Sequence, residues 1–208
     1  MKHLTLIVVL LIPFSLMAQK RLDNTEIYIG TSHGVTASIV GFKPKVEQDF
    51  LLGYNGGLVF RYIADKNVGV QAELNFAQQG WHELDTDFTR RLSYVEVPFM
   101  THIYMGKKAT RFIINLGPQV GLLINEQTTN APINSEAVQQ ITPSQNTFDY
   151  GFVFGLGLSF KVRKNVFQFE TRAYYALGDV YSNAKRDYFS RSNNMKLSAN
   201  LAWLLQVK

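Results

Sequence analysis

Charged side chains recur at alternate positions within segments that are otherwise rich in apolar residues. Successive side chains of a β-strand point to opposite faces, so these charges are predicted to share one face of a sheet. The set comprises three acids, three bases and one histidine: Arg61, Glu73, Glu96, His102, Glu170, Arg172 and Lys196. Charges enclosed away from water must be paired, and this balance predicts an internal salt-bridge network. A gated or ligand-binding lumen is the functional alternative.

Other polar residues have the types needed for catalysis or metal binding. They are Ser32, His33, His82, Asp85 and Asp87. His102 with Glu96 could also serve as a base or a metal ligand, but it has no second ligand at useful spacing. The sequence contains neither a nucleophile elbow nor a metal signature. We therefore expect no enzymatic activity, no catalytic residue, no cofactor and no metal, with a lipid-modifying enzyme as the alternative.

The polar segment 178–194 combines cations with aromatic rings. Its candidate contact residues are Lys185, Arg186, Tyr188, Phe189 and Arg191. Such a combination can contact lipopolysaccharide phosphates or the surface of a partner protein. The alternative is a solvated loop with an aromatic anchor at the membrane boundary.

The N-terminus has the anatomy of a secretory signal peptide. Lys2 precedes an apolar run from Leu4 to Leu11, and small Ala18 precedes Gln19. The run is short for a membrane span, and Pro13 interrupts it. The expected organisation is a signal peptide at residues 1–18 and a single domain at 19–208.

Eight strands are predicted from alternation and turn signals. They cover residues 26–35, 54–64, 68–80, 92–104, 111–124, 148–162, 166–177 and 195–207. The connections alternate in length, with tight turns at 65–67, 106–110 and 163–165 and long polar segments between them. Short turns at one end and long loops at the other are typical of outer-membrane barrels, whose short turns lie in the periplasm.

The segment FDYGFVFGLGLSF (148–160) indicates whether the apolar side chains point out of the barrel or into it. Tyr150, Phe152 and Phe154 begin an apolar face, whereas the opposite face is mostly glycine. A soluble lipid-carrier barrel would place the apolar face inside. The glycines favour the inverted arrangement, with large residues facing lipid and small ones in a crowded interior.

Two further expectations concern single residues in these strands. Aromatic residues near strand ends are predicted to form interfacial girdles: Tyr28, Tyr54, Tyr62, Trp81, Tyr104, Phe112, Tyr150, Phe160, Tyr181 and Trp203. Pro118 removes a ladder hydrogen bond, and a β-bulge is expected there.

Composition excludes several classes of protein. The chain has 208 residues, a hydrophobic content of 46% and no cysteine, so a disordered protein, a disulfide framework and a lipoprotein anchor are excluded. The net charge of +5 is small and scattered, and no nucleic-acid partner is expected.

Five segments carry a resemblance to a known family. They are QAELNFAQQGW (71–81), LSYVEVPFMTHIYMG (92–106), LGPQVGLLI (116–124), FDYGFVFGLGLSF (148–160) and ALGDVYSNAKRDYFSRSNN (176–194). Together they resemble the PorT-like outer-membrane β-barrel family, also described as porin-family or outer membrane protein β-barrel domain proteins. The resemblance implies an eight-stranded barrel in the outer membrane, and its namesake is linked to a secretion system that exports proteases and adhesins. It supplies no catalytic residues.

These observations predict an all-β, eight-stranded, antiparallel, up-and-down transmembrane barrel with short periplasmic turns and long extracellular loops. The expected location is the outer membrane of a Gram-negative bacterium. The leading functional hypothesis is a non-enzymatic structural or interaction role through the loops, in protein secretion or surface assembly; a narrow channel or small-ligand binder is the alternative. Expected partners are outer-membrane lipid and lipopolysaccharide, the barrel-assembly machinery through Trp203 and Leu205, and secreted or surface proteins.

Overall fold

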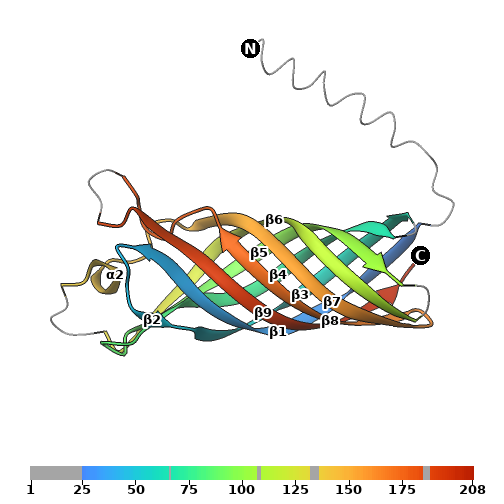
Figure 1. Ribbon diagram of the computed structural model, residues 1–208, viewed down its shortest axis with the longest axis horizontal. Coiled ribbons are helices and arrows are strands. Elements are labelled where there is room, and N and C mark those ends of the chain that lie inside the picture. The colour runs from blue at the N-terminus through green and yellow to red at the C-terminus, as the bar shows by residue number, and fades with distance from the viewer. Residues whose placement is uncertain (1–24, 66, 107–108, 132–135, 185–187) are drawn as a thin grey trace, which may run out of the picture.

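Eight long strands form a closed antiparallel barrel in the computed structural model (Figure 1). The structure describes residues 25–65, 67–106, 109–131, 136–184 and 188–208. The long strands are β1 (Glu26–Lys43), β3 (Leu51–Asp65), β4 (Val68–Glu83), β5 (Thr89–Met105), β6 (Thr110–Thr129), β7 (Phe148–Val162), β8 (Asn165–Ala176) and β9 (Arg191–Gln206). Two short elements, β2 (Gln48–Asp49) and helix α2 (Val138–Ile141), lie in the connections.

Pairing between the first and last strands closes the barrel. Each long strand pairs with its neighbour in sequence, and β1 also pairs with β9 from Tyr28↔Gln206 to Lys43↔Arg191. Closure leaves none of the long strands with an open edge, so their backbone donors and acceptors are used within the wall. Within the described residues, no helix has the length and apolar character needed to cross a membrane.

The two ends of the barrel differ as the sequence predicted. Figure 1 shows the hairpins β3–β4, β5–β6 and β7–β8 turning at the end that carries the C-terminus. The β7–β8 turn is the tightest described, because Val162 pairs with Asn165 and Arg163 adopts a positive φ of 56°. The opposite end carries α2, β2 and the longer connections.

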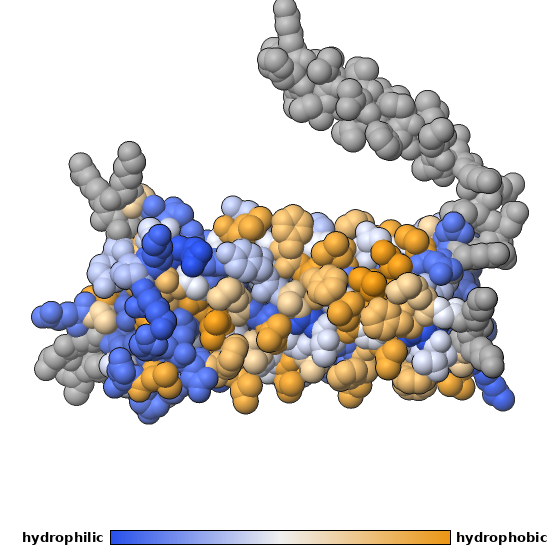
Figure 2. Space-filling view, in the orientation of Figure 1, coloured by the Kyte–Doolittle hydropathy of each residue, from blue (hydrophilic) through white to orange (hydrophobic). Residues whose placement is uncertain are grey.

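The predicted direction of the walls is confirmed. Phe152 and Phe154 are 55% and 42% exposed on the outer face, whereas Gly151 and Gly155 between them are buried in the interior. The space-filling view shows apolar side chains along the length of the cylinder and polar ones gathered at the end that carries the long connections (Figure 2). An apolar outer wall over a polar interior is the arrangement of a membrane barrel.

The strands extend further into the predicted loops than expected. Strand β1 runs to Lys43, where the sequence predicted an end at Val35, and β6 runs to Thr129. In this outer part the pattern inverts, because Val40 and Phe42 point inward and are buried. Above the apolar band the outer face meets water and the apolar residues turn inward, so the lipid-facing alternation that marks a strand disappears.

Two single-residue expectations were wrong. Tyr28, Trp81, Tyr104 and Tyr181 are not girdle residues, because each is buried inside the molecule. No bulge occurs at Pro118, since the β5–β6 register is the same at Pro98↔Gln119 and Thr101↔Leu116 on either side of its level. The register shift lies at Ser93/Tyr94, nearer the loop end.

Candidate functional site

A closed ring of six polar side chains crosses the middle of the lumen. Its members, called the charge ring below, are Arg61, Gln71, Glu73, Gln168, Glu170 and Arg172. Four of the six members come from one repeated pattern: a Gln-x-Glu pair occurs on β4 and again on β8. These two strands lie opposite each other, with three long strands between them on either side. Alternation turns both residues of each pair inward.

The two arginines connect the two Gln-x-Glu pairs. Arg172 donates to both oxygens of Glu73 at 2.7 Å and, through Nη2, to Glu170 Oε2 at 2.9 Å. On the other side of the ring, Arg61 donates to Gln71 Oε1 at 2.7 Å and to Gln168 Oε1 at 2.5 Å. Each glutamine then donates to the glutamate two residues further along its own strand. Both oxygens of Glu73 and Oε2 of Glu170 therefore accept hydrogen bonds from other members of the ring.

Three neighbours extend the charge ring. His102 Nδ1 donates to Asn115 Oδ1 (2.7 Å), and Asn115 Nδ2 donates to Glu170 Oε1 (2.7 Å). Asn75 Nδ2 donates to Glu73 Oε2 (2.8 Å). His102 is thus held by an amide and does not pair with Glu96.

Glu96 belongs to a separate ion pair nearer the loop end. Lys196 Nζ lies 2.5 Å from Glu96 Oε1 and 5.2 Å from the centre of the Tyr174 ring. Together with the charge ring and His102, this pair accounts for all seven residues of the predicted lumen network, and each of them is buried inside the barrel. Among the described residues, no three His, Cys, Asp or Glu side chains are grouped so as to hold a metal ion.

Sequence reasoning missed the amides that complete this network. Gln71, Gln168, Asn75 and Asn115 were not among the predicted site residues, although each of them hydrogen-bonds to a charged group of the network. The repeated Gln-x-Glu was the signal available in the sequence. Recognising it required knowing that β4 and β8 face each other, which depends on closure of the sheet.

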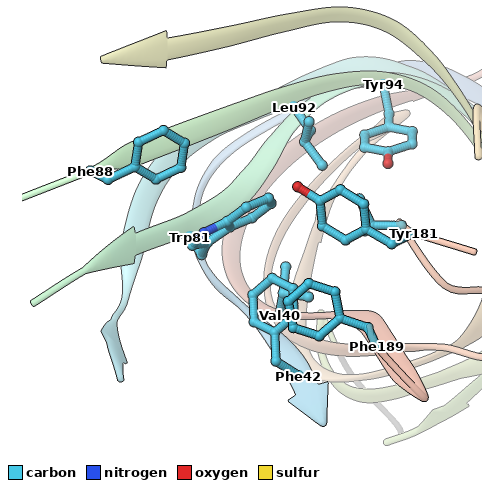
Figure 3. Packing of buried hydrophobic residues seen from close by; sticks show 9 residues of the cluster. Val40, Phe42, Trp81, Phe88, Leu92, Tyr94, Tyr181 and Phe189 are labelled. Carbon is cyan, nitrogen blue, oxygen red and sulfur yellow. The ribbon is translucent and has the colours of Figure 1, made fainter. Parts of the chain in front are cut away.

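An apolar cap seals the lumen at the loop end. It consists of nine buried residues: Val40, Phe42, Trp81, Phe88, Leu92, Tyr94, Val180, Tyr181 and Phe189. Figure 3 shows Tyr181 beside Trp81, with the rings of Phe42 and Phe189 together below them. Phe42 lies 4.9 Å from Phe189 and meets Trp81 edge-on at 5.2 Å between ring centroids, geometries that favour aromatic attraction. The cap joins strand ends to the β8–β9 connection.

Arg90 fastens the cap to the neighbouring loop. Its guanidinium donates to Tyr181 Oη (2.7 Å), to the backbone carbonyls of Gln140 (3.1 Å) and Thr142, and pairs with Glu126 (3.1 Å). It also lies 5.5 Å from the centre of the Trp81 ring. One buried cation thus joins β5, β6, α2 and the β8–β9 connection.

Tyr181 completes the fastening of α2. Its hydroxyl donates to the carbonyl of Gln139 at 3.0 Å. Burial raises the pKa of Tyr181 well above its ordinary value, so the hydroxyl keeps its proton. Gln140 of α2 also donates to Glu83 Oε2 (2.7 Å), which ties the helix to the end of β4.

A second apolar layer fills the lumen at the short-turn end. It consists of Tyr28, Val59, Ile63, Tyr104, Ile113, Val166 and Leu204. Beyond it, Lys161 pairs with Glu26 at 3.2 Å. The charge ring therefore lies between two apolar layers, one at each end of the barrel.

The other candidate residues lie apart from the lumen network. Ser32 points inward, whereas His33 faces outward and lies 2.6 Å from Tyr54 Oη, so these two chain neighbours are on opposite sides of the wall. His82 lies 2.9 Å from Thr89 Oγ1 and 3.7 Å from Asp87. Asp85 is exposed in the β4–β5 connection.

Of the five predicted loop-contact residues, two are exposed, one is buried and two lie outside the described residues. Tyr188 is 60% exposed, and Arg191 is exposed at the start of β9. Phe189 is buried in the cap, so its ring cannot meet a partner at the surface. Lys185 and Arg186 lie outside the described residues.

The fold and its interior define a class of protein: a small membrane-spanning barrel with an apolar outer wall and a filled lumen. The model of the outer membrane protein β-barrel domain matches residues 17–182, and the chain belongs to that family. Membership places it among outer-membrane barrels.

Solved structures of other bacterial barrels are similar to this chain. Ail, the attachment invasion locus protein of Yersinia pestis, is 14% identical with a TM-score of 0.47, covering 86% of this chain and 99% of that one. The N-terminal β-barrel domain of Pseudomonas aeruginosa OprF is 12% identical with a TM-score of 0.48, covering 87% and 96%. Outer Membrane Protein W of E. coli is 15% identical with a TM-score of 0.44, covering 85% and 96%. Comparison with curated protein sequences gives no match.

Proposed function

We propose that this protein is a non-enzymatic outer-membrane barrel that acts through the surface of its capped end. It would serve as a structural or interaction component in protein secretion or surface assembly, the role implied by the resemblance to PorT-like barrels. Its location would be the outer membrane of a Gram-negative bacterium, after removal of residues 1–18. Secreted or surface proteins are the partners expected under this proposal.

The cap is the observation that carries the proposal. Long loops usually remain mobile because few contacts oppose their conformational entropy. Here buried aromatic rings and Arg90 fix three connections to one another. A fixed outer surface loses less conformational entropy when a partner binds than mobile loops would. Ile141 and Tyr188, each 60% exposed, are among the apolar side chains that this surface offers.

The filled lumen supports a role outside the barrel. Charges that served a permeating ion would need free coordination, whereas both glutamates of the charge ring already accept hydrogen bonds at each oxygen. A non-enzymatic role is supported by the separation of Ser32 from His33 across the wall, which removes that nucleophile–base pair.

Complementation of a deletion strain tests the proposal. Loss of the gene should reduce the amount of secreted or surface-attached protein, and wild-type protein should restore it. An Ile141→Asp/Tyr188→Asp variant should fail to restore it while still showing the gel shift of an unboiled, folded barrel. Lys164→Glu, a charge change in the turn at the opposite end, is the control and should restore it. Full restoration by the double variant would contradict the proposal.

A further inference from the structure

A polar groove opens on the outer surface at the loop end of β7 and β8. It has a volume of about 450 Å³, within the range of small-molecule sites, and is lined by parts of segments 145–150 and 177–183. Phe148 and Tyr150 form one side, with their rings stacked at 6.0 Å and an interplanar angle of 26°. The two rings are 56% and 45% exposed, so they offer a free aromatic surface next to polar groups.

The polar side of the groove is held in place before any ligand arrives. Asn146 Nδ2 donates to the carbonyl of Asp179 at 2.8 Å. The Asp179 carboxylate in turn accepts from the Ser192 amide (2.5 Å) and from Asn183 Nδ2 (2.8 Å). Gly178 leaves space beside the Tyr150 ring, because a Cβ at this position would lie 3.2 Å from Tyr150 Cε1.

The chemistry of this lining fits a sugar. A pyranose has a face of C–H groups, which stacks on aromatic rings, and an edge of hydroxyls, which matches amide and carboxylate groups that donate and accept hydrogen bonds. Among the lining residues, all of which lie in the described part of the chain, Asp179 is the one charged side chain. Its negative charge disfavours a phosphate and is compatible with neutral sugars.

Two apolar hollows lie on the membrane wall next to the groove. The nearer one shares no lining residue with the groove, but Tyr150 of the groove and Phe152 of that hollow are consecutive outward residues of β7. These hollows, called the furrow below, have volumes of about 490 and 470 Å³ and share Ala37, Phe154, Ala173 and Leu197 in their lining. Along β7 the outward residues pass from Tyr150 in the groove to Phe154 in the furrow, about 13 Å at the rise of a strand. Ala173 lines both hollows, and its side chain is small beside neighbours such as Phe154 and Leu197.

From this adjacency we infer that the β7–β8 wall binds a glycolipid of the outer leaflet, with its sugar headgroup in the polar groove and an acyl chain in the furrow. A headgroup on Phe148 and Tyr150 would lie at the membrane boundary, where the apolar wall meets the polar end. The inference concerns the membrane wall and goes beyond the proposed role of the capped end, so either can fail without the other.

Native mass spectrometry of the full barrel released from nanodiscs tests the inference. The probes are glucosyl diacylglycerol and phosphatidylglycerol with the same acyl chains, each added to phosphatidylethanolamine, and free maltose in solution. We expect the glucosyl lipid to be retained in preference to phosphatidylglycerol. Phe148→Ala/Tyr150→Ala should lower its retention by about tenfold or more, the loss of one good aromatic contact.

Two further variants separate the possible outcomes. Phe167→Ala/Phe169→Ala removes an equally exposed outward pair near the other end of β8 and should leave retention unchanged. Ala173→Phe fills the furrow without touching the groove and should weaken glycolipid retention. Equal retention of both lipids, or equal losses in the two double variants, would overturn the inference. Maltose binding as strong as that of the glycolipid, unchanged by Ala173→Phe, would also overturn it in favour of a soluble-saccharide site.

Discussion

Removal of Arg172 from the charge ring should strongly destabilise the barrel. Its guanidinium makes three charge-assisted hydrogen bonds, two to Glu73 and one to Glu170, and all three side chains are buried. Arg172→Met leaves two buried carboxylates without a directly bonded cation. Breaking a buried ion pair by removing one partner costs about 3–5 kcal/mol, and we expect a loss of that size.

Two further variants test whether the loss of stability comes from the unpaired carboxylates. Arg61→Met removes a cation that donates its hydrogen bonds to the neutral amides of Gln71 and Gln168, so it should cost less, about 1–3 kcal/mol. Arg172→Met/Glu170→Gln restores the charge balance of the ring and should recover at least about 1 kcal/mol of the loss. Charge balance, and not only lost packing, then accounts for the difference.

The free energy of unfolding can be measured by urea titration of the barrel in lipid vesicles. The two tryptophans report on different places, because Trp81 is buried in the cap and Trp203 lies on the outer wall. Both should give the same midpoint if unfolding is cooperative. A loss below about 1 kcal/mol for Arg172→Met would refute the reasoning, since that is the size of a single exposed pair. An unrecovered double variant would refute the charge-balance argument.

Three other predictions follow from the same structure. Arg90→Met should speed hydrogen exchange of backbone amides at 138–142 and 180–182 while the unboiled gel shift remains, because Arg90 holds the connections and not the wall; unchanged exchange would contradict its fastening role. Gly157→Ala should destabilise the barrel by about 1–3 kcal/mol because its Cβ would lie 2.1 Å from the Phe169 carbonyl oxygen, whereas Gly121→Ala, whose nearest neighbour lies at 3.4 Å, should be tolerated; urea midpoints decide between them. Glu96→Gln/Arg172→Met should lower heat resistance on gels without producing steady conductance in planar bilayers, and a conducting variant would favour the channel hypothesis.

Much of the barrel wall could be predicted because its signal is local. In segment 148–160 each large residue alternates with a small one, and a strand must place these sets on opposite faces whatever the rest of the chain does. The short turn at Arg163–Lys164 was equally readable, since it separates two such segments. The cap could not be predicted in this way, because Val40 lies on β1, Trp81 on β4 and Phe189 in the β8–β9 connection, and they meet only after the sheet has closed.

The sequence by itself determined the strands, the lipid-facing side of each and the inventory of charges that must be enclosed. These follow from the two-residue period of a strand and from the cost of placing charge in lipid. Only the tertiary structure decided which charges meet. Glu73 and Arg172 are 99 residues apart in sequence, and their contact across the lumen depends on β4 and β8 lying opposite each other in a closed eight-stranded wall. The same closure brought the predicted loops together at the loop end of the barrel, where Phe42, Trp81 and Phe189 point inward and form the apolar cap.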